Sequence, residues 1–113
     1  MSESAIDPDI FGEISDLMEE SMPFFIDTYL DNSPKLLAEI VKAVSAGDLE
    51  AIFNNAHQLK GGSGSIGAMQ VFQLAKKIEE ISQKGTDDGS LAALIIELET
   101  AYVAAEAELK KHL

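Results

Sequence analysis

The sequence predicts an all-α protein, an antiparallel up-down four-helix bundle with a short N-terminal helical extension. Apolar residues recur at helical spacing along every long segment, and no segment alternates as a strand does. Gly, Pro and Asp mark short breaks between these segments, and short loops between amphipathic helices require antiparallel neighbours. With 113 residues, the chain is long enough for one core but not for two, so residues 1–113 are expected to form a single domain.

The N-terminal extension is expected to begin at Asp7, a residue type that caps helices well. Pro8 follows at the first helical position, where its fixed φ suits a helix and its missing N–H is not needed. Apolar residues then follow at helical spacing (Ile10, Phe11, Ile14, Leu17 and Met18). The pattern indicates a short helix that ends before the bundle begins.

The first two bundle helices are expected at residues 24–46 and 49–66. Pro34 lies inside the first of them and either starts a new helix or kinks one long helix; we favour the kinked helix. Asp48 can cap the second helix, and Gly67 can end it because glycine adopts the left-handed conformation found after helix C-termini. Within this second helix, Phe53 belongs to the predicted apolar centre (Leu49, Ile52, Phe53 and Ala56).

The last two bundle helices are expected at residues 68–84 and 90–109. The first of them ends in a basic last turn followed by Gly85, a typical C-terminal arrangement. Residues 86–89 then form a turn, and Ser90 is expected to cap the final helix. This helix has apolar residues at i, i+3, i+4 and i+7 spacing, as expected for one that packs on a core.

The charge balance argues against several classes of partner. The chain has 20 acidic residues, 8 lysines and no arginine, a net charge of −12, so nucleic acid and anionic membranes are poor candidates. Residues 1–34 carry a net −9, residues 35–84 a net +1 and residues 85–113 a net −4. The acids either coat solvated helix faces or leave the middle segment free to approach an acidic partner. No signal peptide or transmembrane segment is expected, which favours the cytoplasm.

One stretch of the chain combines a histidine with several glycines. At about 100° per residue, His57 lies at the edge of its helix's apolar face, and Gly61 and Gly64 follow on the same side. Because glycine weakens a helix interior by up to about 1 kcal/mol relative to Ala, something should compensate for its use here. We expect an exposed histidine beside a glycine strip, here defined as Gly61 and Gly64, with Lys60 close by.

This arrangement suits a nucleophile that another macromolecule must reach. A free imidazole has a pKa of about 6.5, so a neutral, nucleophilic ring is available at physiological pH. Phosphoryl transfer fits best, because it needs in-line access and nearby positive charge but little other covalent machinery, and Lys60 can supply the charge. The alternative is a helix-edge His57 with glycines that form a plain loop or a close helix contact.

Other motifs are less convincing. Residues 62–67 match G-x-G-x-x-G, but the dinucleotide-binding version follows a strand, whereas a helical pattern precedes this one. No P-loop sequence is present. A metal site is not expected, because His57 and His112 are the only histidines and no metal-ligand spacing surrounds them. His112 is expected to be a frayed terminal residue.

The segment His57-Gln58-Leu59-Lys60-Gly61, followed by Gly67-Ala68, resembles the H-x-x-K-G…G-A signature of histidine-containing phosphotransfer (HPt) domains. The resemblance extends to the whole chain, since that family is a helical bundle of about this length. It implies a phosphocarrier without an ATP site, rather than an autonomous kinase. Such a carrier accepts a phosphoryl group from a receiver-domain aspartate of a hybrid sensor kinase and passes it to the receiver of a response regulator, with Mg²⁺ held by the receiver and no cofactor of its own.

The resemblance also implies roles for individual residues. His57 would be phosphorylated, Lys60 would stabilise the phosphoryl charge, and Gly61 would let a receiver approach. Many members have a Gln twenty-two residues after the histidine, and here that position is Glu79, which could orient the imidazole through Nδ1. A solvated Glu79 paired with Lys76 is the alternative.

The docking surface expected from this interpretation comprises Gly61, Gly64, Lys76 and Gln83. The last two share the flank of Glu79 and could form a rim around the histidine. We expect a monomer, because an exposed histidine needs no second subunit. The alternative function is a non-phosphorylated helical adaptor or sequestering protein that binds partners through an apolar bundle face, here a strip of Met22, Phe24 and Phe25.

Overall fold

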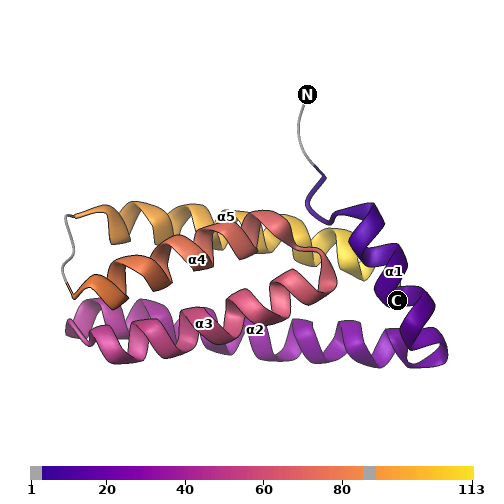
Figure 1. The fold of residues 1–113 in the computed structure, drawn as a ribbon, viewed down its shortest axis with the longest axis horizontal. Helices are drawn as coiled ribbons and strands as arrows, with labels where there is room; N and C mark the ends of the chain where they lie inside the picture. The colour runs from indigo at the N-terminus through magenta and orange to yellow at the C-terminus, as the bar shows by residue number, and fades with distance from the viewer. Residues whose placement is uncertain (1–3, 86–88) are drawn as a thin grey trace.

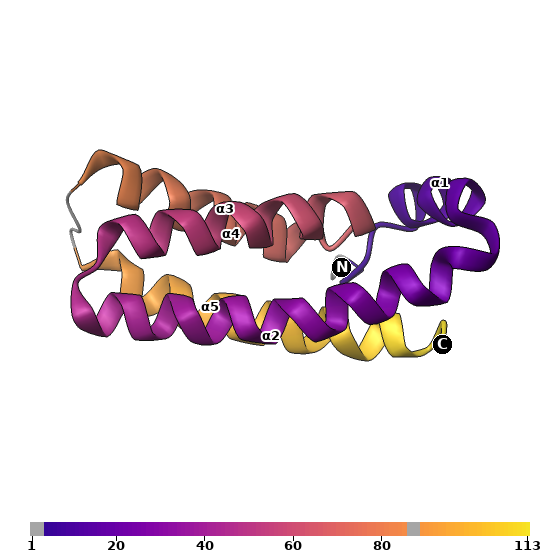
Figure 2. The same ribbon diagram turned by 90° about the horizontal axis from the view of Figure 1, so that it is seen from below.

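The computed structural model describes residues 4–85 and 89–113 and confirms the predicted fold. Within these residues, α2 (Met22–Ala46), α3 (Leu49–Ile66), α4 (Met69–Lys84) and α5 (Ser90–Lys110) form the bundle. Each packs against its neighbour in the chain, and α5 closes the ring against α2. The short α1 (Pro8–Met18) lies at one end of the bundle and contacts α2 and α3 (Figures 1 and 2).

The helix ends follow the capping chemistry of the sequence. The Asp7 carboxylate accepts hydrogen bonds from the N–H groups of Asp9 and Ile10, and α1 therefore begins at Pro8 as predicted. The Asp48 carboxylate likewise accepts from the N–H of Ala51 at the start of α3. Gly67 and Gly85 end α3 and α4 with φ of +90° and +79°, values that glycine adopts without a steric penalty.

Two helix starts differ from the expected ones by one or two residues, and one cap position differs. The first bundle helix is one long helix with Pro34 inside it, as predicted, but it begins at Met22 after a short 3₁₀ turn (Glu19–Ser21). Helix α4 begins at Met69, with Ala68 as its N-cap. Helix α5 starts at Ser90 itself, and Gly89 takes the cap position that we expected for Ser90. Of the predicted turn at residues 86–89, residues 86–88 lie outside the described residues.

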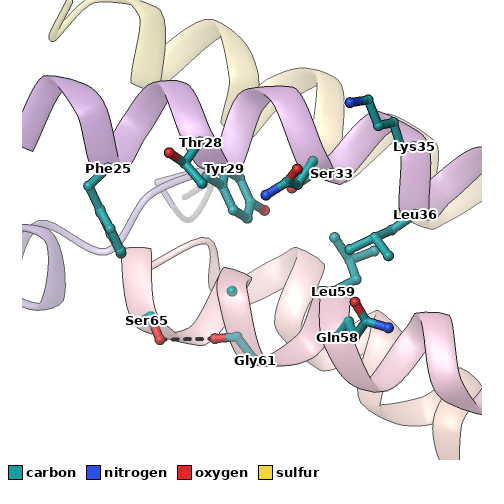
Figure 3. A pocket seen from close by; sticks show the side chains of 12 residues that line it. Phe25, Thr28, Tyr29, Ser33, Lys35, Leu36, Gln58, Leu59, Gly61 and Ser65 are labelled. Atoms are coloured by element: carbon teal, nitrogen blue, oxygen red, sulfur yellow. Dashed lines mark hydrogen bonds between the residues drawn. The ribbon is translucent and has the colours of Figure 1, made fainter.

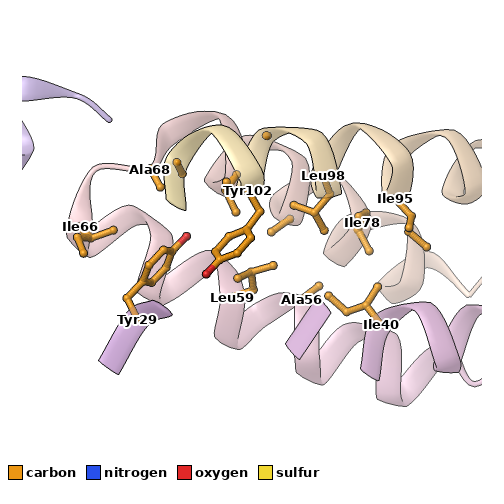
Figure 4. Packing of buried hydrophobic residues seen from close by; sticks show 14 of the residues in the cluster. Tyr29, Ile40, Ala56, Leu59, Ile66, Ala68, Ile78, Ile95, Leu98 and Tyr102 are labelled. Atoms are coloured by element: carbon orange, nitrogen blue, oxygen red, sulfur yellow. The ribbon is translucent and has the colours of Figure 1, made fainter. Parts of the chain in front are cut away.

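The core runs along the inside of the four bundle helices (Figure 4). Tyr29 and Tyr102 bring polar groups into it: the Tyr29 hydroxyl and Ser63 Oγ lie 2.7 Å apart, and the Tyr102 hydroxyl donates to the Leu30 carbonyl at 3.5 Å. Burial raises the pKa of both tyrosines, so their hydroxyls stay neutral and can donate. These two tyrosine hydrogen bonds join α2 to α3 and to α5.

Three predicted placements are corrected by this packing. Phe53 is only half-buried and does not pack against the core cluster, because it lies at the edge of the apolar face of α3. Met22 is buried, so the apolar strip expected for an adaptor loses one of its three members; Phe24 is exposed and Phe25 is half-buried. His112 lies beyond the end of α5 and is exposed, but it is not without contacts, because its ring packs against Phe11 of α1 with 4.6 Å between centroids.

Among the helices in residues 4–85 and 89–113, none combines the length and the apolar character that a membrane span requires.

Candidate functional site

The site is centred on His57, near the middle of α3. Its side chain is 62% exposed, as the position at the edge of the apolar face predicts. Glu79, from the facing helix α4, reaches the same place but is only 11% exposed. One Glu79 oxygen, Oε2, lies 2.6 Å from His57 Nδ1, and the other, Oε1, lies 2.8 Å from Lys60 Nζ. One carboxylate therefore binds both polar side chains that the sequence singled out on α3.

The protonation of these groups follows from the geometry. Burial opposes ionisation of Glu79, but the hydrogen bonds from Lys60 and His57 outweigh it and lower the pKa of Glu79 below its usual value. An ionised carboxylate can only accept hydrogen bonds, so His57 Nδ1 must carry the proton that it shares with Oε2. In a neutral ring, this leaves a lone pair on Nε2. The exposed imidazole is thus held in the tautomer in which Nε2 is the nucleophile.

The α4 residues expected near the histidine behave differently from one another. Glu79 does not pair with Lys76, the alternative that the sequence left open; its ammonium partner is Lys60. Lys76 and Gln83 are exposed, one turn before and one turn after Glu79, so they lie on the α4 flank where a rim was expected. Within the described residues, no ion pair involves Lys76, which leaves its charge available at the surface.

The glycines inside α3 face three different surroundings. A Cβ on Gly61 would meet nothing within 4 Å, so this position is open as predicted. A Cβ on Gly64 would lie 3.0 Å from Cδ1 of Phe72, so the expectation that Gly64 extends an open strip is wrong: the Phe72 ring of α4 packs there. A Cβ on Gly62 would lie 3.6 Å from the ring of Tyr29. The open part of the expected glycine strip is therefore Gly61 alone.

Gly61 borders a groove between α2 and α3 that sequence reasoning missed (Figure 3). We call it the α2–α3 groove; its volume is about 540 Å³. It is lined by apolar and polar side chains from both helices, among them Phe25, Thr28, Leu36, Gln58 and Ser65. Its α2 residues carry no motif, and only the packing of α2 beside α3 brings them to the histidine-bearing helix.

A second feature missed from the sequence is the contact between Phe53 and His57. Their rings are nearly parallel, with an angle of 11° between planes and 6.0 Å between centroids. The i, i+4 spacing could have revealed this contact, but the periodicity favoured a core position for Phe53.

The structure also bears on the G-x-G-x-x-G match and on metal binding. Residues 62–66 of the G-x-G-x-x-G match are helical. No cluster of metal-ligating side chains occurs in the part of the chain that the structure describes.

Comparisons with known proteins point to one family. The model of the Hpt domain matches residues 25–109. Histidine-containing phosphotransfer protein 1 of Oryza sativa subsp. japonica is 26% identical over 92 residues, which are 76% of this chain and 63% of that protein. Histidine-containing phosphotransfer protein 4 of Arabidopsis thaliana is 30% identical over 87 residues, 72% of this chain and 68% of that protein. This chain thus spans about two-thirds of the length of these curated relatives.

A solved structure agrees with the sequence comparisons. The crystal structure of histidine-containing phosphotransfer protein B from Pseudomonas aeruginosa PAO1 superposes with a TM-score of 0.92 at 28% identity, covering 98% of this chain and 96% of that one. The likeness therefore includes the N-terminal extension, which lies outside the matched family model. With the family model matching three-quarters of its length, this chain belongs to the Hpt domain family.

Proposed function

We propose that this protein carries phosphoryl groups in a multistep two-component phosphorelay, with His57 as the residue that is phosphorylated. The observation that carries the proposal is the hydrogen bond between His57 Nδ1 and the ionised Glu79 on α4. This bond presents the Nε2 lone pair of an exposed imidazole to an approaching protein. The family and the curated relatives support the same activity, in preference to a non-phosphorylated adaptor.

In the proposed step, the Nε2 lone pair attacks the phosphorus of an aspartyl phosphate on a receiver domain. A P–N bond forms while the P–O bond to the aspartate breaks, and the receiver's carboxylate leaves with the bonding electrons. The imidazole of His57 keeps its Nδ1 proton and gains a positive charge, which the Glu79 carboxylate balances at 2.6 Å. In the reverse step, the aspartate of a second receiver attacks the phosphorus and Nε2 regains its electron pair.

Lys60 is proposed to stabilise the charge of the transferred group. Its side chain is 24% exposed, and its ammonium has three donors, one of which binds Glu79 at 2.8 Å. The other two remain for phosphoryl oxygens that reach the exposed face of α3. Lys60 therefore links the carboxylate that orients the imidazole to the group that the imidazole accepts.

Receiver docking is proposed over Gly61 and the α2–α3 groove, with Lys76 and Gln83 at the opposite rim. The open space at Gly61, one turn after His57, supports close approach of a partner backbone. Apolar groove residues such as Phe25 and Leu36 can supply the desolvated centre of such an interface. The proposal places Mg²⁺ in the receiver and includes the expected monomeric state and cytoplasmic location.

The test is phosphoryl transfer from a panel of phosphorylated receiver domains, followed by intact mass and by the stability of the adduct in acid and alkali. Wild type should gain one phosphoryl group that is acid-labile and alkali-stable, as a phosphoramidate is, and His57→Gln should gain none. Lys60→Ala should slow transfer by about tenfold without abolishing it, a loss of about 1.4 kcal/mol in transition-state stabilisation. If wild type gained no group from any receiver or from the small donor phosphoramidate, the proposal would be wrong and His57 would be a structural residue.

A further inference from the structure

Phe53 is a half-buried aromatic residue, and packing against the core does not account for its aromatic side chain. It lies one turn before His57 on α3 and is not among the apolar residues that pack against the core cluster. Its ring contact is with the His57 imidazole, 6.0 Å between centroids and 11° from parallel. Side chains on a helix lean towards its N-terminus, so the imidazole of residue 57 naturally lies over residue 53. The contact therefore follows from the spacing and from the helix geometry.

The hydrogen bond to Glu79 does not by itself fix the imidazole. The ring can still pivot about its Cβ–Cγ bond within the range of angles that a hydrogen bond tolerates, and each pivot changes the direction of the Nε2 lone pair. This lone pair lies in the plane of the ring, so the plane of the imidazole sets the line along which phosphorus must approach. A second ring stacked nearly parallel restricts that pivot. The direction of attack then runs within 11° of the plane of the Phe53 ring.

We infer that Phe53 is a positioning residue for phosphoryl transfer: its ring holds the plane of the His57 imidazole so that Nε2 points along the line of attack. The inference rests on the proposed function. A receiver docked over Gly61 holds its aspartyl phosphate at one place in space, so only a correctly oriented Nε2 can meet it in line. A small donor that diffuses freely can approach from any direction and does not need this orientation. A loss of transfer rate with the receiver but not with the small donor therefore indicates positioning. Misplacement of reacting groups by about 1 Å can slow a reaction by about 10²-fold.

The test compares Phe53→Leu, which keeps apolar bulk without a ring, and Phe53→Tyr, which keeps the ring. The control is Phe11→Leu, because Phe11 is another half-buried phenylalanine that packs on a histidine, His112, outside the site. Three quantities are measured for each variant: the maximal transfer rate from a phosphorylated receiver, the receiver concentration at half-maximal rate, and the rate of phosphorylation by phosphoramidate. Because the chain has only two histidines, ¹⁵N NMR of the rings follows the tautomer of His57 directly, with His57→Gln for assignment.

We expect Phe53→Leu to lower the maximal transfer rate by about tenfold, within the range that misplacement allows. The half-maximal concentration, the phosphoramidate rate and the Nδ1–H tautomer should stay unchanged. Phe53→Tyr should transfer within about twofold of wild type, and Phe11→Leu should match wild type, since neither removes the ring beside His57. This pattern would support positioning, because a merely structural role would also alter the tautomer or the reaction with the small donor.

Other results would overturn the inference without touching the proposed function. An unchanged maximal rate in Phe53→Leu would mean that the ring does not orient the imidazole. A raised half-maximal concentration at an unchanged maximal rate would make Phe53 a receiver contact instead. An equal loss in Phe53→Tyr and Phe53→Leu, or a parallel loss with phosphoramidate, would indicate a structural role. Failure of the proposed function gives a separate result, in which wild type itself gains no phosphoryl group on His57.

Discussion

Substitutions at Gly61 can separate effects on the stability of the fold from effects on phosphoryl transfer. It lies inside α3, it is exposed, and a Cβ added there meets nothing within 4 Å. Gly61→Ala should therefore fit the fold and stabilise it by about 1 kcal/mol, the helix-propensity difference between the two residues. An unfolding entropy of about 2.1 cal/mol/K per residue gives about 240 cal/mol/K for 113 residues, so Tm should rise by about 4 °C.

Gly61→Gln should keep the stability of the fold but slow phosphoryl transfer from a receiver. Glutamine is also a better helix former than glycine, so the fold should be at least as stable as wild type. Its long side chain, however, would lie beside the α2–α3 groove, one turn from His57, where the receiver is proposed to dock. Transfer from a phosphorylated receiver should fall by at least about tenfold, the cost of about 1.4 kcal/mol of lost interface energy. The assay pairs thermal unfolding with transfer measured by intact mass.

The controls separate docking from chemistry. Phosphorylation of Gly61→Gln by phosphoramidate should proceed at the wild-type rate, because a small donor does not need the docking surface. Gly12, in the interior of α1, is the matched position, since a Cβ there also meets nothing within 4 Å. Gly12→Gln should leave receiver transfer unchanged. If Gly61→Gln transferred as fast as wild type, Gly61 would not lie in the docking surface and the proposed interface would be refuted.

Two further predictions concern stability. Because the pKa of Glu79 is lowered in the folded state, its ionisation stabilises the fold fully above the unfolded carboxyl pKa of about 4.3, and this stabilisation is lost as the pH falls through the lowered folded value. The difference in unfolding free energy between wild type and Glu79→Gln should therefore be larger at pH 7 than at pH 3 in urea titrations; an equal difference at both would contradict the ionised state. Gly67→Ala should destabilise the fold by about 2 kcal/mol, because φ is +90° and the new Cβ would lie 3.1 Å from the Asp7 carbonyl oxygen. Gly85→Ala, with φ of +79° but open space, should cost less, and an equal loss of Tm in both would show that the contact with Asp7 does not matter.

The helix ends could be predicted from the sequence because capping is local chemistry. Asp7 and Asp48 accept the hydrogen bonds expected of N-caps, and Gly67 and Gly85 adopt the positive φ expected of C-terminal glycines. Each of these arrangements involves residues within a few positions along the chain. The start of α2 at Met22 was missed by two residues, because a 3₁₀ turn joins α1 to α2 and Pro23 lies inside the first turn of α2 instead of before it.

The candidate site was predictable only in part, since it depends on how helices face one another. The phase of α3 placed His57 at the edge of an apolar face, the family resemblance suggested Glu79 as its partner, and the structure joins the two. The same reasoning could not tell that Lys60 binds Glu79, or that Phe72 packs over Gly64, because each contact joins side chains from two helices. Periodicity within one helix assigns a face, whereas the neighbour that meets this face is decided by tertiary packing.

The three glycines inside α3 all lower helix stability, but they differ in what compensates for the loss. Each weakens the helix by about 1 kcal/mol relative to alanine. At Gly64 this loss is offset by packing, because the Phe72 ring lies 3.0 Å from the place where a Cβ would be; at Gly62 a Cβ would make ordinary contact with the Tyr29 ring at 3.6 Å. At Gly61 no such neighbour lies within the described residues, so packing inside the domain does not account for the missing side chain. A partner that approaches the helix one turn from His57 does account for it, whereas an adaptor that binds through an apolar face elsewhere on the bundle would gain nothing from it.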